Sequence, residues 1–160
     1  VLATAGTDAK CAEMTRFGAD HAINYRTQDF VAEVKARTDG RLCDVVLDMV
    51  GGSYTAKNLR LLRDDGRLVF INAMQGSAAE FNALDLMARR LTITGSTLRP
   101  RSPDFKAALA AAVEEHVWPL LAAGRFRPVI YRTFPLAQVA DAHRLLESSQ
   151  HIGKIVLEMA

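Results

Sequence analysis

The sequence predicts an α/β fold in which a mostly parallel sheet is covered by helices. Short apolar, β-branched runs alternate along the chain with segments of helical spacing, which is typical of repeated strand–helix–strand units. Glycine-containing turns separate these segments, as at Gly18, Gly40 and Gly51-Gly52. Because such sheets bind ligands at the carboxyl ends of their strands, functional residues are expected at those ends.

The first hundred residues are predicted to hold five strands and four helices. Val1–Ala5 is the first strand, and the helix that follows it over residues 9–17 has Asp8 as its expected N-cap. Asp29 is expected to open the second helix, which ends near Gly40. The remaining elements are strands at 22–25, 43–48, 67–72 and 91–96 and helices at 53–63 and 82–90.

A long helix opens the second part of the chain. Ser102 is its predicted N-cap, and Pro103 suits the first helical position because the missing N–H is not needed there. Pro119 should kink or end this helix. A strand at 129–134, a helix at 136–146 and a strand at 155–157 are expected to follow.

Composition and charge narrow the class of protein. The chain has 160 residues, of which 49% are hydrophobic and 24% charged, as in an ordinary globular protein. The formal charge of +2 and the scattered basic residues argue against nucleic acid as a partner. No apolar run approaches the ~20 residues that span a membrane, so no membrane association is expected.

The cysteines and histidines do not form a metal-binding pattern. Cys11 and Cys43 lie far apart and are expected to be free thiols of a reducing compartment, which favours a cytoplasmic location. The four histidines are dispersed, and none shares a metal-ligand spacing with a cysteine. No metal site is predicted.

An ordered set of motifs gives the chain a recognisable pattern. The set comprises Thr4-Ala5-Gly6-Thr7-Asp8-x-Lys10, Phe17-Gly18-Ala19-Asp20, Asn24-Tyr25-Arg26, Asp44-Val45-Val46-Leu47-Asp48-x-Val50-Gly51-Gly52, Gly66-Arg67-Leu68-Val69 and His151-Ile152-Gly153-Lys154-Ile155-Val156-Leu157. In this order and spacing it resembles the C-terminal portion of the medium-chain dehydrogenase/reductase superfamily. The most similar branch is that of the zinc-independent NAD(P)H:quinone oxidoreductases.

The resemblance implies a Rossmann-like, doubly wound parallel sheet. It places residue 1 at the second strand of a dinucleotide-binding domain, so that the first strand and the glycine-rich loop are lacking. That loop normally holds the pyrophosphate on helix N-terminal amides, and the chain contains no GxGxxG motif. By the same resemblance, residues 1–128 are a partial dinucleotide-binding domain, and residues 129–160 return to a substrate domain.

The residues at the end of the first strand predict whether the cofactor is NAD or NADPH, which carries an additional 2′-phosphate. NAD sites usually place an acidic residue there to bind the ribose hydroxyls, whereas this strand ends in Gly6 and Thr7, with Lys10 one turn later. A small strand end, a helix N-terminus and a lysine suit the 2′-phosphate of NADPH, and the resemblance adds Tyr25 to the same site. The alternative interpretation is that Lys10 is a solvated helix lysine and that Tyr25 packs at a strand end.

The loops after the later strands are weaker candidates. By resemblance, Val50, Asn72 and Met74 line the adenine and nicotinamide ends of the cofactor, and Leu98 lies near the nicotinamide. Plain turn chemistry explains these residues equally well. No catalytic acid or base is predicted, because hydride transfer needs mainly orientation and a shielded pocket.

The resemblance therefore implies the NADPH-binding part of an oxidoreductase that transfers hydride to a quinone or a conjugated carbonyl (an enone). The isolated chain is expected to be inactive. Alternatives are the cofactor half of an enoyl reductase or of a zinc-type alcohol dehydrogenase, or a non-catalytic NADPH-binding protein. A homodimer is expected through Leu91–Ser96, an edge strand without charged residues.

Overall fold

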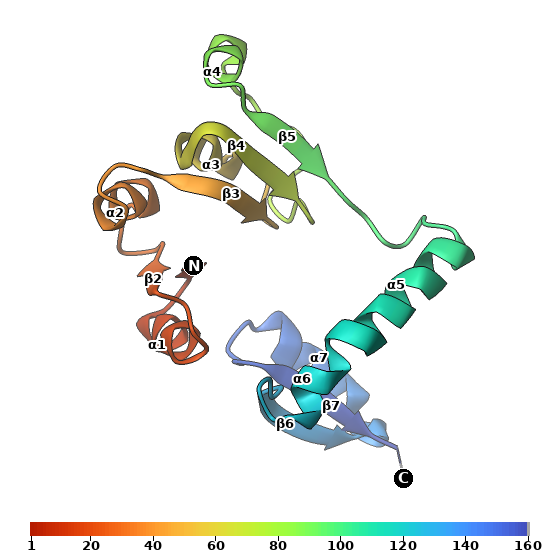
Figure 1. The fold of residues 1–160 in the computed structure, drawn as a ribbon. Coiled ribbons are helices and arrows are strands. Elements are labelled where there is room, and N and C mark those ends of the chain that lie inside the picture. The colour runs from red at the N-terminus through yellow and green to blue at the C-terminus, as the bar shows by residue number, and fades with distance from the viewer. Residues whose placement is uncertain (160) are drawn as a thin grey trace. The chain divides into compact units, whose positions relative to one another are not determined.

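The computed structural model describes residues 1–159, which form two compact units (Figure 1). Val1–Arg101 make up the first unit, and Ser102 to the C-terminus make up the second. The functional boundary expected after residue 128 is a different division and stays a prediction.

The first unit alternates strands and helices along its whole length. Its strands are β1 (Leu2–Ala5), β2 (His21–Asn24), β3 (Cys43–Asp48), β4 (Leu62–Phe70) and β5 (Thr92–Gly95). Its helices are α1 (Asp8–Arg16), α2 (Phe30–Arg37), α3 (Tyr54–Arg60) and α4 (Ala83–Ala88). Every strand pair is parallel, which confirms the predicted α/β class.

The parallel strands fall into two sheets. β1 pairs with β2, and β3, β4 and β5 form a three-stranded sheet in that order. Among the described residues no ladder joins β1 to β3. The pair β2-β1 and the sheet β3-β4-β5 match positions 3-2 and 4-5-6 of the doubly wound order 3-2-1-4-5-6.

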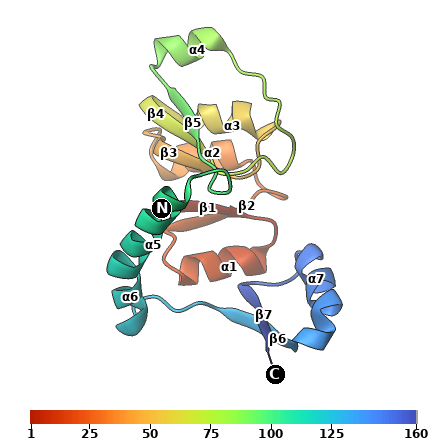
Figure 2. The same ribbon diagram turned by 90° about the vertical axis from the view of Figure 1, so that its right-hand side faces the viewer.

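A common hydrophobic cluster connects the two sheets. Phe30 and Val34 of α2 are buried against Ile23 of β2 and against Leu61, which follows α3. α2 also packs on α3, and Figure 2 shows the two helices side by side. A second cluster, made of Leu59, Leu62, Leu68 and Leu91, fixes α3 to β4 and β5.

Two predicted boundaries differ from those observed. The helix expected at 53–63 ends at Arg60, and β4 begins at Leu62. Leu62 already pairs with Cys43 in the β3–β4 ladder, and the register then shifts before Val45 pairs with Arg67. Leu62, which local periodicity assigned to a helix, therefore belongs to β4, because it pairs with the neighbouring strand β3.

The second unit consists of α5 (Pro103–His116), α6 (Trp118–Ala122), β6 (Ile130–Pro135), a 3₁₀ turn (Leu136–Gln138), α7 (Val139–Glu147) and β7 (Lys154–Glu158). The Ser102 hydroxyl accepts a hydrogen bond from the Phe105 amide at 3.2 Å, which confirms the predicted cap. Pro119 lies at the start of α6, so the long helix ends before it. β6 and β7 form a parallel pair.

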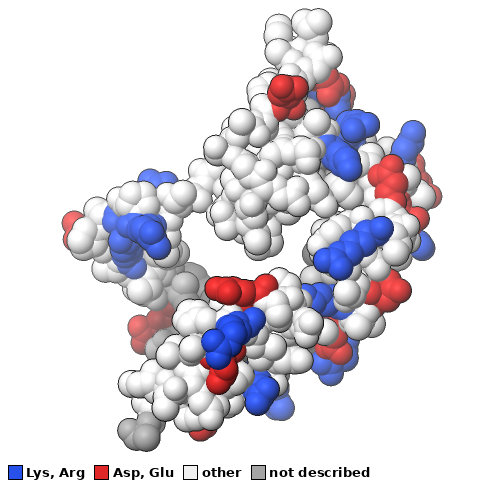
Figure 3. Space-filling view, turned by 180° about the vertical axis from the view of Figure 1, so that it is seen from behind, with Lys and Arg blue, Asp and Glu red and all other residues white. Residues whose placement is uncertain are grey.

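Charged side chains are dispersed over the face of the molecule that Figure 3 shows. Basic and acidic residues alternate on the face shown in Figure 3, in line with the small formal charge of +2. Among residues 1–159, no helix is both long and apolar enough to cross a membrane.

Candidate functional site

Two side chains converge on the carboxyl end of β1. If Gly6 carried a Cβ, that atom would lie 2.8 Å from the Tyr25 hydroxyl oxygen and 3.3 Å from Nε of Arg26. The absence of a side chain at Gly6 therefore lets Tyr25 and Arg26 lie directly over the strand end. This is the position at which the adenosine end of a dinucleotide is expected.

The start of α1 differs from the sequence prediction. Thr7, not Asp8, is the N-cap, because the Thr7 hydroxyl oxygen accepts a hydrogen bond from the Lys10 amide at 3.2 Å. Asp8 is the first residue of the helix, and its carboxylate accepts a hydrogen bond from Nδ2 of Asn24 at 2.6 Å. The Thr7 hydroxyl still has its hydrogen to donate.

Asn24 organises the turn between β2 and α2. Its side chain is buried, and its Oδ1 accepts a hydrogen bond from the Arg26 amide at 3.1 Å. Its own amide donates to the side-chain oxygen of Gln28, also at 3.1 Å. These bonds fix the backbone that directs Tyr25 and Arg26 toward Gly6.

An aromatic cluster supports the Tyr25 ring. Tyr25 meets Tyr54 edge to face, with ring centroids 6.4 Å apart, and Tyr54 stacks on Phe30 at 5.5 Å. Nζ of Lys57 lies 5.8 Å from the ring centroid of Tyr54 and also 5.8 Å from that of Phe30. Burial, and then the neighbouring Tyr25, raises the pKa of Tyr54 above its ordinary value. The cluster joins Tyr25 to the buried core through Phe30.

The loops after β3 and β4 are hydrogen-bonded to each other. Oδ1 of the buried Asp48 accepts hydrogen bonds from the amides of Val50 (2.6 Å) and Gly51 (3.2 Å). The Met74 amide donates to the Met49 carbonyl at 3.2 Å. Oδ2 of Asp48 is buried without a hydrogen-bond partner among the described residues.

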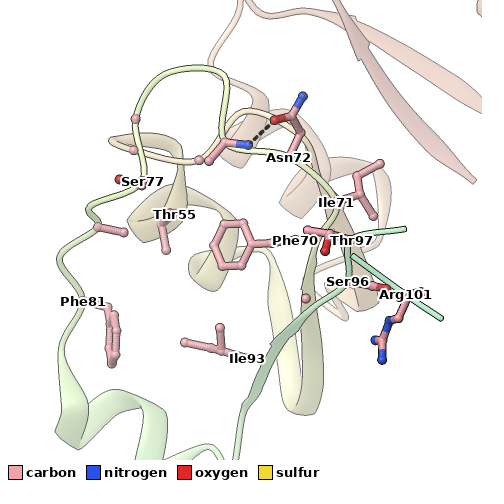
Figure 4. Close-up of a pocket in the computed structure, with 16 residues that line it drawn as sticks. Thr55, Phe70, Ile71, Asn72, Ser77, Phe81, Ile93, Ser96, Thr97 and Arg101 are labelled. Carbon is pink, nitrogen blue, oxygen red and sulfur yellow. Dashed lines mark hydrogen bonds between the residues drawn. The ribbon is translucent and has the colours of Figure 1, made fainter. Parts of the chain in front are cut away.

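A cavity of about 640 Å³ lies beside these loops. Phe70, Phe81, Ile93 and Thr55 surround it in Figure 4. Asn72 also lines it, but the Asn72 side chain folds back and accepts a hydrogen bond from the Ala73 amide at 2.8 Å (Figure 4). The lining is therefore mainly apolar, with a few polar groups at its edge.

The structure brings the predicted residues together in two groups. Gly6, Thr7, Lys10 and Tyr25 meet at the ends of β1 and β2. The second group lies at the carboxyl ends of β3, β4 and β5 and contains Val50, Asn72, Met74 and Leu98. Met74 and Leu98 are exposed and do not line the cavity.

Sequence reasoning did not single out Arg26 and Asn24, which the structure places beside the candidate residues Gly6 and Tyr25. Both stand beside Tyr25 in the Asn24-Tyr25-Arg26 motif, so the signal was present in the sequence. Among residues 1–159, no group of three or more His, Cys, Asp or Glu side chains could hold a metal ion.

Comparison with known proteins assigns this arrangement to a family. A family model described as zinc-binding dehydrogenase matches residues 17–157. The chain belongs to this family. A quinone oxidoreductase of Lama guanicoe is 32% identical to it over 162 residues, covering 98% of this chain and 46% of that protein. The chain thus spans about half the length of the curated relatives it matches.

Solved structures of the family share the fold. The Escherichia coli quinone oxidoreductase in complex with NADPH has a TM-score of 0.80 and 26% identity, covering 97% of this chain and 48% of that one. An NAD-dependent alcohol dehydrogenase has a TM-score of 0.78 and 29% identity, covering 100% and 44%. These matches confirm the predicted superfamily, the quinone oxidoreductase branch and the Rossmann-type domain.

Proposed function

We propose that this chain is the NADPH-binding part of an oxidoreductase that transfers hydride to a quinone or another conjugated carbonyl. The observation that supports this proposal most directly is the end of β1. Gly6 occupies the position where NAD sites have an acidic ribose ligand, and the Tyr25 hydroxyl lies over it. The nearest carboxylate, Asp8, is engaged by Asn24. A quinone oxidoreductase complexed with NADPH is among the structural neighbours, which supports the same cofactor here.

The first group of residues is proposed to bind the adenosine phosphate. The Thr7 hydroxyl and the Tyr25 hydroxyl have hydrogens to donate, and Lys10 adds a positive charge at the start of α1. The α1 N-terminus favours an anion at the same place. Gly6 allows the phosphate to approach the backbone.

The second group of residues, at the carboxyl ends of β3, β4 and β5, is proposed to lie beside the rest of the cofactor and the substrate. Val50, Asn72 and Met74 follow β3 and β4, and Leu98 follows β5, where the adenine and nicotinamide ends are expected. The bound cofactor supplies the hydride. The residues of this chain orient it and, through apolar groups such as Phe70 and Phe81, limit access of water.

A homodimer through Leu91–Ser96 is part of this proposal. β5 pairs with β4 on one side, and its Thr92 and Thr94 side chains are exposed. Among the described residues no strand pairs with its other edge. Light scattering of the full-length protein at micromolar concentration should give the mass of a dimer, and a monomer would contradict the proposed pairing.

The catalytic proposal is tested by following oxidation of NADPH and of NADH by the full-length protein, with 1,4-benzoquinone or an enone as acceptor. We expect turnover with NADPH, and the 160-residue chain alone should bind NADPH no tighter than micromolar and reduce neither acceptor. Oxidation of alcohols with NAD⁺ would favour the alcohol dehydrogenase alternative. Tight NADPH binding without any turnover would favour a non-catalytic binding protein.

A further inference from the structure

A second cavity, of about 690 Å³, lies at the amino ends of β3, β4 and β5. In its wall, Leu42 precedes β3, Arg63 belongs to the start of β4, and Arg89 precedes β5. The proposed cofactor residues follow the carboxyl ends of the strands, which in a parallel sheet form the opposite edge. Of the described residues in this wall, only Phe81 also lines the first cavity. The second cavity is therefore separate from the proposed cofactor site.

The charged groups of the wall are four arginines and two aspartates, namely Arg41, Arg60, Arg63, Arg89, Asp64 and Asp85. Arg89 pairs with both aspartates, at 3.7 Å from Asp64 and 3.3 Å from Asp85. Its guanidinium also donates hydrogen bonds to the carbonyl oxygens of Leu59 and Leu62. Arg89 is thus fixed at the end of α3, and the two aspartates are neutralised by it.

The other three arginines have too few carboxylates among the described residues. Nη2 of Arg41 and Nε of Arg63 share the carboxylate of Asp44, at 3.6 Å and 2.5 Å. Arg60 is exposed in the last turn of α3, and its side chain has no ion-pair or hydrogen-bond partner within residues 1–159. Arg89 already binds the Leu59 carbonyl there. This side of the cavity therefore carries an excess of positive charge.

Apolar side chains line the same cavity. They come from the loop before β3, from α3 and from the segment before α4, and they are Leu42, Ala56, Leu59 and Phe81. The Phe81 residue is 48% exposed, so a large part of its ring surface remains in contact with water. A ligand with a ring of its own would cover that surface, which is favourable in proportion to the apolar area removed from water.

We propose that this cavity binds a small organic anion in which a phosphate is joined to an aromatic group. Arg60 and Arg63, with Arg41 beside them, bind the phosphate, because guanidinium groups present paired N–H donors that match phosphate oxygens. Phe81 and the other apolar side chains contact the aromatic group. The proposal is independent of the proposed function, because it concerns the other edge of the sheet.

The experiment uses phenyl phosphate as the probe and inorganic phosphate, which lacks the ring, for comparison. Binding of each to the full-length protein is measured by calorimetry with excess NADPH present, which competes for the proposed cofactor site. Phenyl phosphate should bind about 10-fold more tightly than inorganic phosphate, because its ring covers Phe81. No binding at millimolar phenyl phosphate, or equal affinities for the two probes, would overturn the proposal.

Two substitutions in the arginine group should act in opposite directions. Arg60→Ala should weaken phenyl phosphate binding about 10-fold, and Arg60→Lys should restore only part of the loss. Asp44→Asn should strengthen binding about 2- to 5-fold, because it frees Arg41 and Arg63 from their shared carboxylate. A damaged fold would not produce such a gain. Unchanged binding in either Arg60→Ala or Asp44→Asn would contradict the proposed phosphate contacts.

Two controls locate the probe. Arg37 is also exposed, but it lies on α2, pairs with Glu33 at 3.7 Å and does not line the cavity, so Arg37→Ala should leave binding unchanged. Lys10→Ala, at the proposed cofactor site, should also leave it unchanged. A loss with Arg37→Ala equal to that with Arg60→Ala would show a general effect of charge and refute the site. A loss confined to Lys10→Ala would place phenyl phosphate at the cofactor end, so that this proposal fails while the proposed function stands.

Discussion

Replacing Gly6 by alanine should separate the fold of this chain from its phosphate binding. The new Cβ would lie 2.8 Å from the Tyr25 hydroxyl oxygen, too close for a carbon–oxygen contact, and 3.3 Å from Nε of Arg26. Both neighbours are the ends of flexible, exposed side chains, so they can swing away without moving the backbone. The substitution therefore displaces Tyr25, a proposed phosphate ligand, together with the neighbouring Arg26.

The expected magnitude follows from the loss of one proposed hydrogen bond, that of the Tyr25 hydroxyl to the phosphate. Losing a hydrogen bond to a charged group costs about 1.5–3 kcal/mol, so Gly6→Ala should weaken NADPH binding about 10- to 100-fold. NADH binding should change much less, because NADH lacks the 2′-phosphate. The φ angle of Gly6 is not in the left-handed region, so alanine is permitted there. Stability should be unchanged or raised by up to about 1 kcal/mol, because alanine restricts the unfolded chain.

Calorimetric titration of the full-length protein with NADPH and NADH measures the first effect, and a urea unfolding curve measures the second. A variant that binds NADPH like wild type would show that Tyr25 is not a phosphate ligand. Equal losses for NADPH and NADH would place the disturbance elsewhere in the site. A large loss of stability would show that the contacts over Gly6 are structural.

Three further substitutions test other parts of the structure. Lys10→Ala should weaken NADPH binding about 10- to 100-fold and spare NADH, and equal losses in the two titrations would exclude its phosphate role. Gly66→Ala should destabilise the fold by about 1–3 kcal/mol in urea unfolding, because its Cβ would lie 2.7 Å from the Arg63 carbonyl oxygen, and an unchanged midpoint would refute this reasoning. Arg90 lowers the pKa of Asp65 below its ordinary value of 3.8, so the pair stabilises the folded state above that pH and stops doing so as the pH falls through the lowered pKa. Asp65→Asn should accordingly lower the thermal midpoint at pH 7 but not below the lowered pKa, and a difference that persists in acid would contradict the ion-pair explanation.

Much of the fold could be predicted because its signals are local. The Ser102 cap and Pro103 at the first helical position mark the start of α5, and the apolar run at Cys43–Asp48 marks β3. Strands separated by helices also require parallel pairing, since a helix between two strands returns the chain to the same end of the sheet. That topology alone placed Gly6 and Tyr25 at neighbouring strand ends.

The sequence by itself determined that this chain is parallel α/β and which strand ends carry the candidate site. Only the tertiary structure decided which side chains meet there. Asp8 has the residue type of an N-cap, but Asn24, sixteen residues later, offers it a hydrogen bond, and Thr7 takes the cap. Arg26 gains its position only when the β2–α2 turn brings it over Gly6. Such contacts join residues that are distant in the chain, and their geometry depends on packing that local residue patterns do not encode.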